Sequence, residues 1–192
     1  MEFILASASP RRKELLTNII EKFAICNSRF DEASIIFNNN PNEYVEKIAK
    51  GKVQSVYNNL EIKNNKIIIS CDTIVLLDNE VLGKPKDEHE AYLMLKKLSN
   101  NKHCVFSGFA VYNTKTKEII KKSVCTEVIF KELSDKEIYD YINKGESLDK
   151  AGAYGIQGAA AIYIKGIKGC YYNVVGLPLN TLYETLMEMG VI

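Results

Sequence analysis

The sequence predicts a mixed α/β fold in which a twisted sheet is flanked by helices. Apolar runs of strand length alternate with segments whose apolar residues recur at helical spacing through most of the 192 residues. Two polar turns, at residues 78–79 and 113–117, separate neighbouring strand-like runs and predict antiparallel hairpins. An α/β alternation that also contains hairpins predicts a mixed sheet.

The strands are expected at seven short, mainly apolar runs. In chain order these are residues 3–6, 23–26, 67–71, 74–77, 103–112, 119–130 and 160–164. The turn at 78–79 joins the fourth run to a short partner at 81–82, and the turn at 113–117 joins the two longest runs.

Helices are predicted where apolar residues recur three and four positions apart. Three stripes of this kind are Val45, Ile48, Ala49, Val53, Val56 and Leu60; Ala91, Met94, Leu95 and Leu98; and Leu179, Leu182, Leu186 and Met189, the last closed by Gly190. Two further helices are indicated by N-terminal signals, Ser9 followed by Pro10 and the capping box of Ser134 with Glu137. Their expected buried residues are Leu15, Leu16, Ile19 and Ile20 in the first, and Ile138, Tyr141 and Ile142 in the second.

Length and composition indicate a single domain over residues 1–192 that acts on a small ligand. The net charge of +1 provides no overall field for nucleic acid or anionic lipid. No apolar run approaches the roughly 20 residues that cross a bilayer, and the N-terminus lacks the pattern of a signal peptide. Five scattered cysteines without a C-x-x-C pair favour the reducing cytoplasm over a disulfide framework or a structural zinc site.

A first candidate site lies where the first strand meets the first helix. Ser7, Ser9, Arg11 and Arg12 surround a helix start, whose free N–H groups and positive dipole end suit a phosphate group. The chain has only three arginines, and two of them occur here. The alternative is an ordinary helix cap beside solvated basic residues, and the residues alone do not decide between the two.

A second candidate site is Asp72, which follows the apolar run at 67–71. An Asp at the carboxyl end of a buried strand faces the crevice where α/β proteins bind ligands. If Asp72 stood alone, a turn cap or a structural hydrogen bond would be the simpler explanation. Lys84 follows a short hairpin later, between Gly83 and Pro85, and its alternative is an ordinary exposed turn lysine.

Two carboxylates, a lysine and a glycine-rich loop complete the candidates. Asp31-Glu32 could add a carboxylate for Mg²⁺, and Lys52 a further cation, although a solvated loop and an exposed lysine are the alternatives. The loop at 150–158 has three glycines that would let backbone approach a ligand, while Gln157 offers a donor and an acceptor for a base edge. It matches neither the dinucleotide fingerprint nor the P-loop.

Together these motifs resemble the Maf family of nucleoside triphosphate pyrophosphatases. In order they are Leu5-Ala6-Ser7-Ala8-Ser9-Pro10-Arg11-Arg12-Lys13-Glu14-Leu15-Leu16, Cys71-Asp72-Thr73, Gly83-Lys84-Pro85, the loop at 150–158, and Val175-Gly176-Leu177-Pro178-Leu179. The match covers nearly the whole chain. It departs from the family at Ser107, where Thr is usual, and at Ser70-Cys71, where Gly-Ala is commoner; both changes exchange small residues for small ones.

The resemblance implies a fold like that of the inosine triphosphate pyrophosphatases (Ham1), with a deep cleft between two lobes. It implies hydrolysis of a nucleoside triphosphate to the monophosphate and pyrophosphate, a divalent metal, Mg²⁺ or Mn²⁺, and commonly a homodimer. The catalytic residues implied are Asp72, Glu32 and Lys84, with Asp72 as proton acceptor and with Asp72 and Glu32 as metal ligands. The phosphate-binding positions implied are Ser7, Arg12, Lys52 and Lys84, and the family's dTTP/UTP branch carries the residues found here as Arg11, Thr73 and Gln157.

Other functions remain open on the sequence. The chain could bind nucleotides as a regulator of cell division without turnover, or prefer 7-methyl-GTP. It could also be a metal-dependent nuclease or phosphatase, although the near-zero net charge disfavours a polynucleotide. The sequence does not decide whether Asp72 is the general base or a metal ligand.

Overall fold

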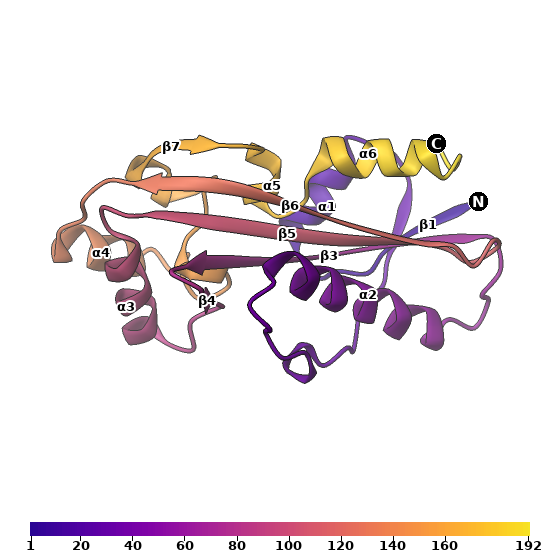
Figure 1. Ribbon diagram of the computed structural model, residues 1–192, viewed down its shortest axis with the longest axis horizontal. Helices are drawn as coiled ribbons and strands as arrows, with labels where there is room; N and C mark the ends of the chain where they lie inside the picture. The colour runs from indigo at the N-terminus through magenta and orange to yellow at the C-terminus, as the bar shows by residue number, and fades with distance from the viewer. The chain divides into compact units, whose positions relative to one another are not determined.

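The computed structural model describes all 192 residues, which form one seven-stranded mixed sheet with flanking helices. The strands lie in the order β2-β1-β3-β5-β6-β7, and β4 pairs with β3 (Figure 1). The strands are β1 (Glu2–Leu5), β2 (Phe23–Ile25), β3 (Lys66–Leu77), β4 (Glu80–Leu82), β5 (Lys102–Asn113), β6 (Ile119–Phe130) and β7 (Ile164–Lys168). The α-helices are α1 (Pro10–Leu16), α2 (Pro41–Asn59), α3 (Glu88–Leu98), α4 (Asp135–Ile142), α5 (Tyr171–Val175) and α6 (Leu179–Glu188). The expected mixed α/β fold is confirmed.

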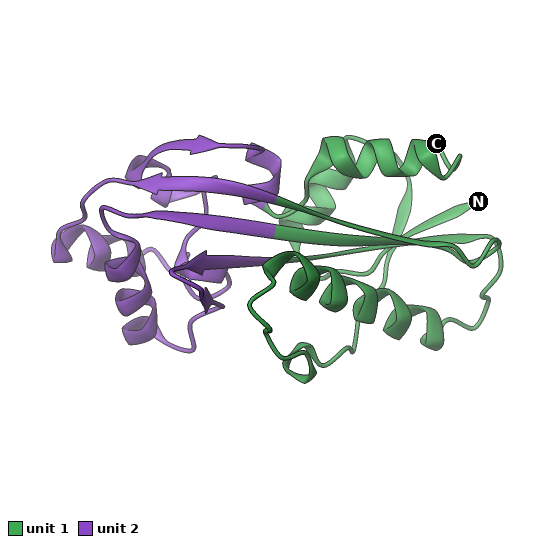
Figure 2. Ribbon diagram, in the orientation of Figure 1, with its two compact units in different colours: residues 1–72, 107–124, 176–192 green, residues 73–106, 125–175 purple.

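The chain divides into two compact units, which Figure 2 distinguishes by colour. Unit 1 contains residues 1–72, 107–124 and 176–192, and unit 2 contains residues 73–106 and 125–175. The division falls within β3, β5 and β6, so each of these strands contributes one part to each unit.

The core of unit 1 forms between the sheet and α2. Strand β1 pairs in parallel with β2 and with β3. The crossover from β1 to β2 contains α1, and the crossover from β2 to β3 contains α2 and runs across the sheet in the opposite direction. Because both crossovers are right-handed, the two helices lie on opposite faces of the sheet, with α6 on the same side as α1 (Figure 1). The cluster under α2 contains Ile4, Ala6, Ala49, Val53, Val56, Ile68 and Ala110.

Helix α2 begins and packs as its sequence requires. The Asn40 side chain caps it by accepting the Glu43 N–H at 3.1 Å, and Pro41 occupies the first turn. Gly108 on β5 permits close approach, since a Cβ there would lie 2.7 Å from the backbone carbon of Val45. Strand and helix therefore meet at van der Waals distance.

The core of unit 2 lies around α3, α4 and the strand ends of this unit. Tyr92 of α3 stacks on Tyr139 of α4 at 4.9 Å between ring centroids, and the Tyr92 hydroxyl donates to Asp135 at 2.9 Å. The expected capping box at Ser134 and Glu137 is confirmed. Strand β7 pairs antiparallel with β6, and β4 pairs antiparallel with β3 through the expected turn at 78–79.

Three expected elements differ from those observed. The runs at 67–71 and 74–77 form one strand, β3, so Asp72 lies inside a strand and not at its end. The strand expected at 160–164 is wrong: a 3₁₀ helix (Ala159–Tyr163) occupies most of this run, and the strand that follows it is β7. Helix α1 ends at Leu16, because the Thr17 hydroxyl and Asn18 amide donate to carbonyls of its last turn. Ile19 and Ile20 therefore lie beyond the helix.

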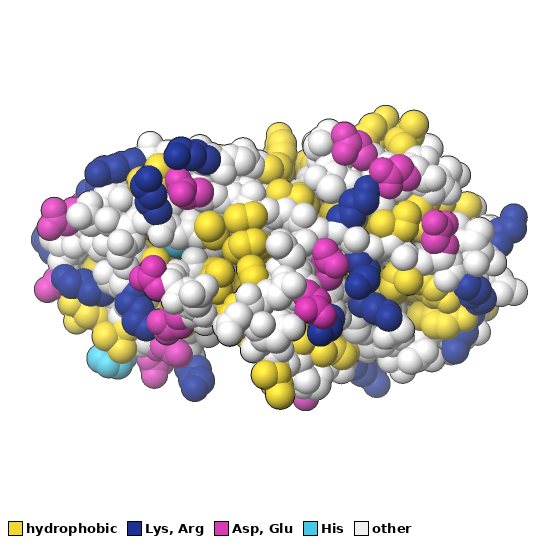
Figure 3. Space-filling view, viewed as in Figure 1, with side chains coloured by type: hydrophobic (Ala, Val, Ile, Leu, Met, Phe, Trp, Pro, Cys, Tyr) yellow, Lys and Arg dark blue, Asp and Glu magenta, His cyan; other side chains and the backbone are white.

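The charged surface is mixed in sign, and the helices are not of membrane-spanning type. On the face drawn in Figure 3, Lys and Arg side chains are interspersed with Asp and Glu. None of the helices combines the length and apolar character that a bilayer crossing needs.

Candidate active site

A buried lysine lies between two carboxylates in unit 1. Lys52 Nζ is 2.7 Å from Asp72 Oδ1 and 2.8 Å from Glu32 Oε1. The side chains of Lys52 and Asp72 are each 10% exposed, whereas that of Glu32 is 54% exposed. Removing two charges from water costs free energy that their mutual attraction does not fully repay, and loss of either partner would leave the other charge uncompensated. Stability alone therefore does not explain why unit 1 has this buried pair.

The elements around this cluster fix its members. The Ser70 hydroxyl of β3 donates to the Ala49 carbonyl of α2 at 2.6 Å, three residues before Lys52. Gly51 leaves room on the helix for the ring of Phe30, which a Cβ would displace. Packing of Phe30 on this glycine brings the following residues, including Glu32, against α2.

Tyr44, on α2, lies within the electrostatic influence of Asp72 and Glu32, a position that the sequence pattern did not single out. Burial and the negative charges of Asp72 and Glu32 raise the pKa of its hydroxyl, so Tyr44 remains a neutral donor. Tyr44 lies eight residues before Lys52, on the same face of α2. This helical spacing is the sequence feature that could have placed Tyr44 near Lys52.

The turn after β1 gathers the first group of predicted phosphate ligands. The Ser7 hydroxyl accepts from the Ser9 N–H at 3.2 Å and from Arg12 Nη1 at 3.4 Å. The Ser9 hydroxyl caps α1 by accepting the Arg12 N–H at 3.4 Å. The predicted helix cap is confirmed, and Arg11 takes the second position of the same helix.

The carbonyl of Gly176 joins this turn to β3. It accepts from Arg12 Nε at 2.9 Å and from the Cys71 thiol at 3.2 Å. Gly176 has φ 122°, a conformation that side chains other than glycine rarely adopt. Arg12 is thus fixed beside the residue that precedes Asp72, so both groups of candidates in unit 1 belong to one region.

The two carboxylates fit a divalent cation in number and chemistry. Both lie within 2.8 Å of a single positive centre, the Lys52 ammonium, which shows that they converge on one cation. Nowhere in the chain, this pair included, do three or more His, Cys, Asp or Glu side chains gather to hold a metal. Mg²⁺ commonly takes one or two carboxylates and completes its shell with substrate phosphates and water, as this pair would require.

The remaining candidates belong to unit 2. Thr73 is its first residue, and Lys84 and Gln157 are exposed, the latter in a turn at 156–158. The amide of Gly152 donates to the carbonyl of Gly83 at 3.0 Å, so the lysine turn and the glycine-rich loop are hydrogen-bonded to each other. Gly152 has φ 67°, and a Cβ there would lie 2.9 Å from a methyl group of Val75. Only glycine fits this contact.

The predicted residues are therefore grouped by unit. Unit 1 brings together Glu32, Lys52 and Asp72 with Tyr44, and separately ties Ser7 and Ser9 to Arg12; unit 2 contains Thr73, Lys84 and Gln157. None of the five cysteines forms a disulfide, and the thiol of Cys71 has the hydrogen bond described above.

The chain matches the family described as Maf-like protein over residues 2–189. The dTTP/UTP pyrophosphatase of Clostridium botulinum strain Okra is 53% identical over 188 residues, which cover 98% of this chain and 97% of that protein. That of strain Eklund 17B is 53% identical over 191 residues and 100% of both chains. Among solved structures, the Ham1 protein of Staphylococcus aureus gives a TM-score of 0.49 at 12% identity, over 68% of this chain and 72% of its own.

Proposed function

Because the chain belongs to the Maf family, we propose that it is a nucleoside triphosphate pyrophosphatase that hydrolyses dTTP and UTP to the monophosphate and pyrophosphate. The observation that carries this proposal is the convergence of Asp72 and Glu32 on Lys52, in a protein 53% identical over its full length to relatives named for that activity. Carboxylates and a buried ammonium are the groups that phosphoanhydride hydrolysis needs.

In the proposed reaction, Asp72 accepts a proton from the water that attacks the α-phosphorus. The new bond joins water oxygen to the α-phosphorus, the bond from that phosphorus to the bridging oxygen breaks, and pyrophosphate leaves with the electron pair. A triphosphate carries about four negative charges, and Lys52, Lys84 and Arg12 oppose them. The Lys52 ammonium exchanges part of its carboxylate contact for phosphate oxygen as the substrate binds.

The metal proposed for this site is Mg²⁺ or Mn²⁺, held by Asp72 and Glu32. When bound, such an ion supplies positive charge at the phosphates and acidifies a coordinated water. Asp72 can then serve as ligand, as base, or as both. Tyr44, a neutral donor within the electrostatic influence of the same carboxylates, orients them or the attacking water.

Base recognition is assigned to unit 2 and to α1. We propose that Gln157 reads the N3–H and O4 of uracil or thymine, with Thr73 and Arg11 as further contacts. Ser7 and Ser9 contribute to the phosphate contacts through the turn that fixes Arg12. A homodimer in the reducing cytoplasm is part of the same proposal, and five cysteines without a disulfide are consistent with a reducing compartment.

The test is a nucleotide panel with identified products. Purified protein with Mg²⁺ or Mn²⁺ is offered dTTP, UTP, CTP, GTP and 7-methyl-GTP, and products are separated chromatographically. We expect pyrophosphate and a pyrimidine monophosphate, with no reaction in excess EDTA. Orthophosphate as product would indicate a phosphatase, binding without turnover would indicate a regulator, and full activity in EDTA would remove the metal.

Asp72→Asn tests the proton acceptor in the same assay. The change keeps the shape and removes the basic site, so turnover should fall about 10²–10⁴-fold while the fold persists. Asp140→Asn is the matched control, because Asp140 is an exposed partner of Lys136 on α4. Near-normal turnover by folded Asp72→Asn protein would refute the assignment.

A further inference from the structure

Gln157 lies in the glycine-rich loop at 150–158, and this loop must be held in one conformation if Gln157 is to discriminate between bases. Gln157 is exposed in a three-residue turn. A carboxamide that rotates freely can present its donor and acceptor in either order, and so pairs with uracil and cytosine alike. Selectivity then depends on how firmly the loop holds the residue.

Buried side chains hold this loop at Tyr154, three residues before Gln157. Nε2 of His103, on β5, lies 2.7 Å from the Tyr154 hydroxyl, and the two residues are 2% and 5% exposed. Phe130 contacts both rings edge to face, at centroid distances of 5.1 Å from His103 and 4.8 Å from Tyr154. The three rings form a closed aromatic cluster with one internal hydrogen bond.

That hydrogen bond forms with a neutral histidine. Burial lowers the pKa of His103 to about 4, so the ring is neutral at pH 7 and carries one N–H. Nδ1 of His103 is buried and has no partner. In either tautomer, therefore, the bond between Nε2 and the Tyr154 hydroxyl is the contact that fixes the ring.

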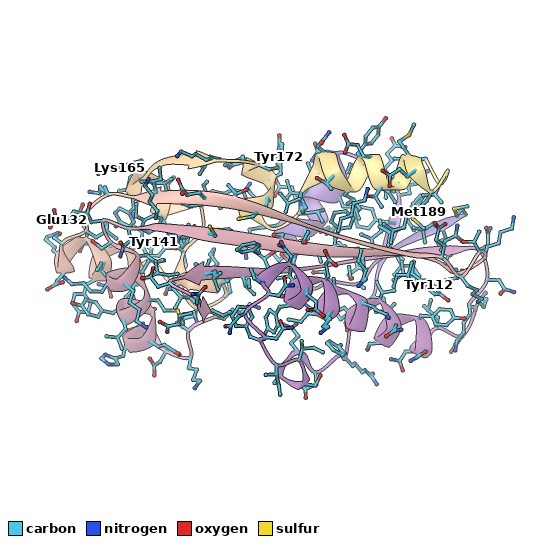
Figure 4. All side chains as sticks on the ribbon, viewed as in Figure 1. Tyr112, Glu132, Tyr141, Lys165, Tyr172 and Met189 are labelled. Atoms are coloured by element: carbon cyan, nitrogen blue, oxygen red, sulfur yellow. The ribbon has the colours of Figure 1, made fainter.

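The rest of the loop is attached on either side of Tyr154. Before it, the Gly152 amide donates to Gly83. After it, the Ala159 amide donates to Glu146 at 3.1 Å. Between these attachments, Ala153 and Tyr154 enter the core of unit 2. The same core contains Tyr141, labelled in Figure 4, whose pKa burial raises to about 12.

We propose that His103 is a positioning residue for base selection: through its hydrogen bond with the Tyr154 hydroxyl, it holds the loop so that Gln157 presents its amide in one orientation. This inference rests on the proposed function only in taking Gln157 as the residue that reads the base. A purely structural role would affect stability alone, whereas this role affects the ratio of activities toward different bases.

The experiment compares three variants by the ratio of kcat/KM for UTP to that for CTP. His103→Leu removes the imidazole partner of the bond, Tyr154→Phe removes its hydroxyl partner, and His103→Gln supplies an amide in place of Nε2. We expect the ratio to fall about 3–10-fold in the first two, from the loss of one buried hydrogen bond, and to recover in the third. Pyrophosphate release continues in all three. Leu186→Ala, a fully buried site on α6 in unit 1, controls for lost stability and should leave the ratio unchanged.

Binding measurements separate this inference from the proposed function. The dissociation constants of UTP and CTP are measured calorimetrically in EDTA for the same proteins. If the wild type prefers UTP without hydrolysing it, and the preference falls in His103→Leu and Tyr154→Phe, the proposed function fails and this inference stands. If the folded variants keep the wild-type preference in both assays, His103 does not position the loop.

Discussion

Lowering the pH from 7.5 to 5 should destabilise this protein mainly through one buried side chain, His103. Its ring is 2% exposed, and burial depresses its pKa from the ordinary 6.5 to about 4. The unfolded chain therefore binds a proton in this window while the folded chain does not, so stability falls as the pH falls through 6.5 toward 4. Well above pH 6.5 the ring is neutral in both states and contributes no slope.

The expected size follows from the two pKa values. A difference of 2.5 units corresponds to at most about 3 kcal/mol, and the part realised between pH 7.5 and pH 5 is about 2 kcal/mol. Carboxylates whose pKa is lowered, such as Glu137 at about 2, lose their contribution only as the pH falls below about 4.5. The window above pH 5 thus reports chiefly on histidine.

The assay is urea denaturation at pH 7.5, 6.5, 5.5 and 5.0 for wild type, His103→Gln and His89→Gln. His89 is the only other histidine and is exposed on α3, so its replacement should leave the wild-type pH dependence intact. Replacing His103 should remove about 2 kcal/mol of the loss at pH 5, whatever its effect at pH 7.5. Equal pH dependence in wild type and His103→Gln would contradict a depressed pKa, and with it the neutral ring at pH 7.

Three further substitutions test other parts of the structure. Lys52→Met leaves Asp72 buried without its partner and should lower the free energy of unfolding by about 3–5 kcal/mol. Urea denaturation of the double variant with Asp72→Asn should show part of this free energy restored, and no recovery would argue against the pairing. Gly108→Ala forces a methyl group into the backbone of α2 and should destabilise unit 1 by about 1–3 kcal/mol, and an unchanged denaturation midpoint would show that the helix has room to shift. Gln157→Glu removes the donor that O4 requires, so kcat/KM should fall more for UTP and dTTP than for CTP, while an equal loss with all nucleotides would show that Gln157 does not read the base.

The elements that could be predicted are those whose residues carry a local signal. The stripe from Val45 to Val56 determines α2 because helical spacing is a property of neighbouring residues. Asp72 was misplaced at a strand end because a carboxylate interrupts an apolar run. Its neutralisation by Lys52, twenty residues away, is a tertiary contact with no local signature. The bounds of β7 were predicted wrongly for a related reason, since its pairing with β6 determines where the strand begins and ends.

The candidate site shows the same limit. Ser7, Arg12, Lys52 and Asp72 were identified by motif, but their mutual contacts, through the Gly176 carbonyl and the Lys52 ammonium, depend on the fold. Tyr44 and His103 lie in unremarkable helix and strand patterns. Only their burial beside charged or polar partners distinguishes them from other core aromatic and histidine residues.

The division of the chain between the two units has a consequence for synthesis on the ribosome. Unit 1 includes the N-terminus yet needs residues 176–192, whereas unit 2 is complete once residue 175 has been made. β1, α1 and α2 therefore emerge from the ribosome before α6, which completes the residues of unit 1, has been translated. Domains generally fold from the N-terminus during synthesis, but here the unit containing Asp72 is the second to have its whole chain available. Truncation after Val175 should leave nascent unit 2 with all of its residues and unit 1 without α6. Leu182 and Leu186, which α6 buries, are therefore among the last residues of unit 1 to be made.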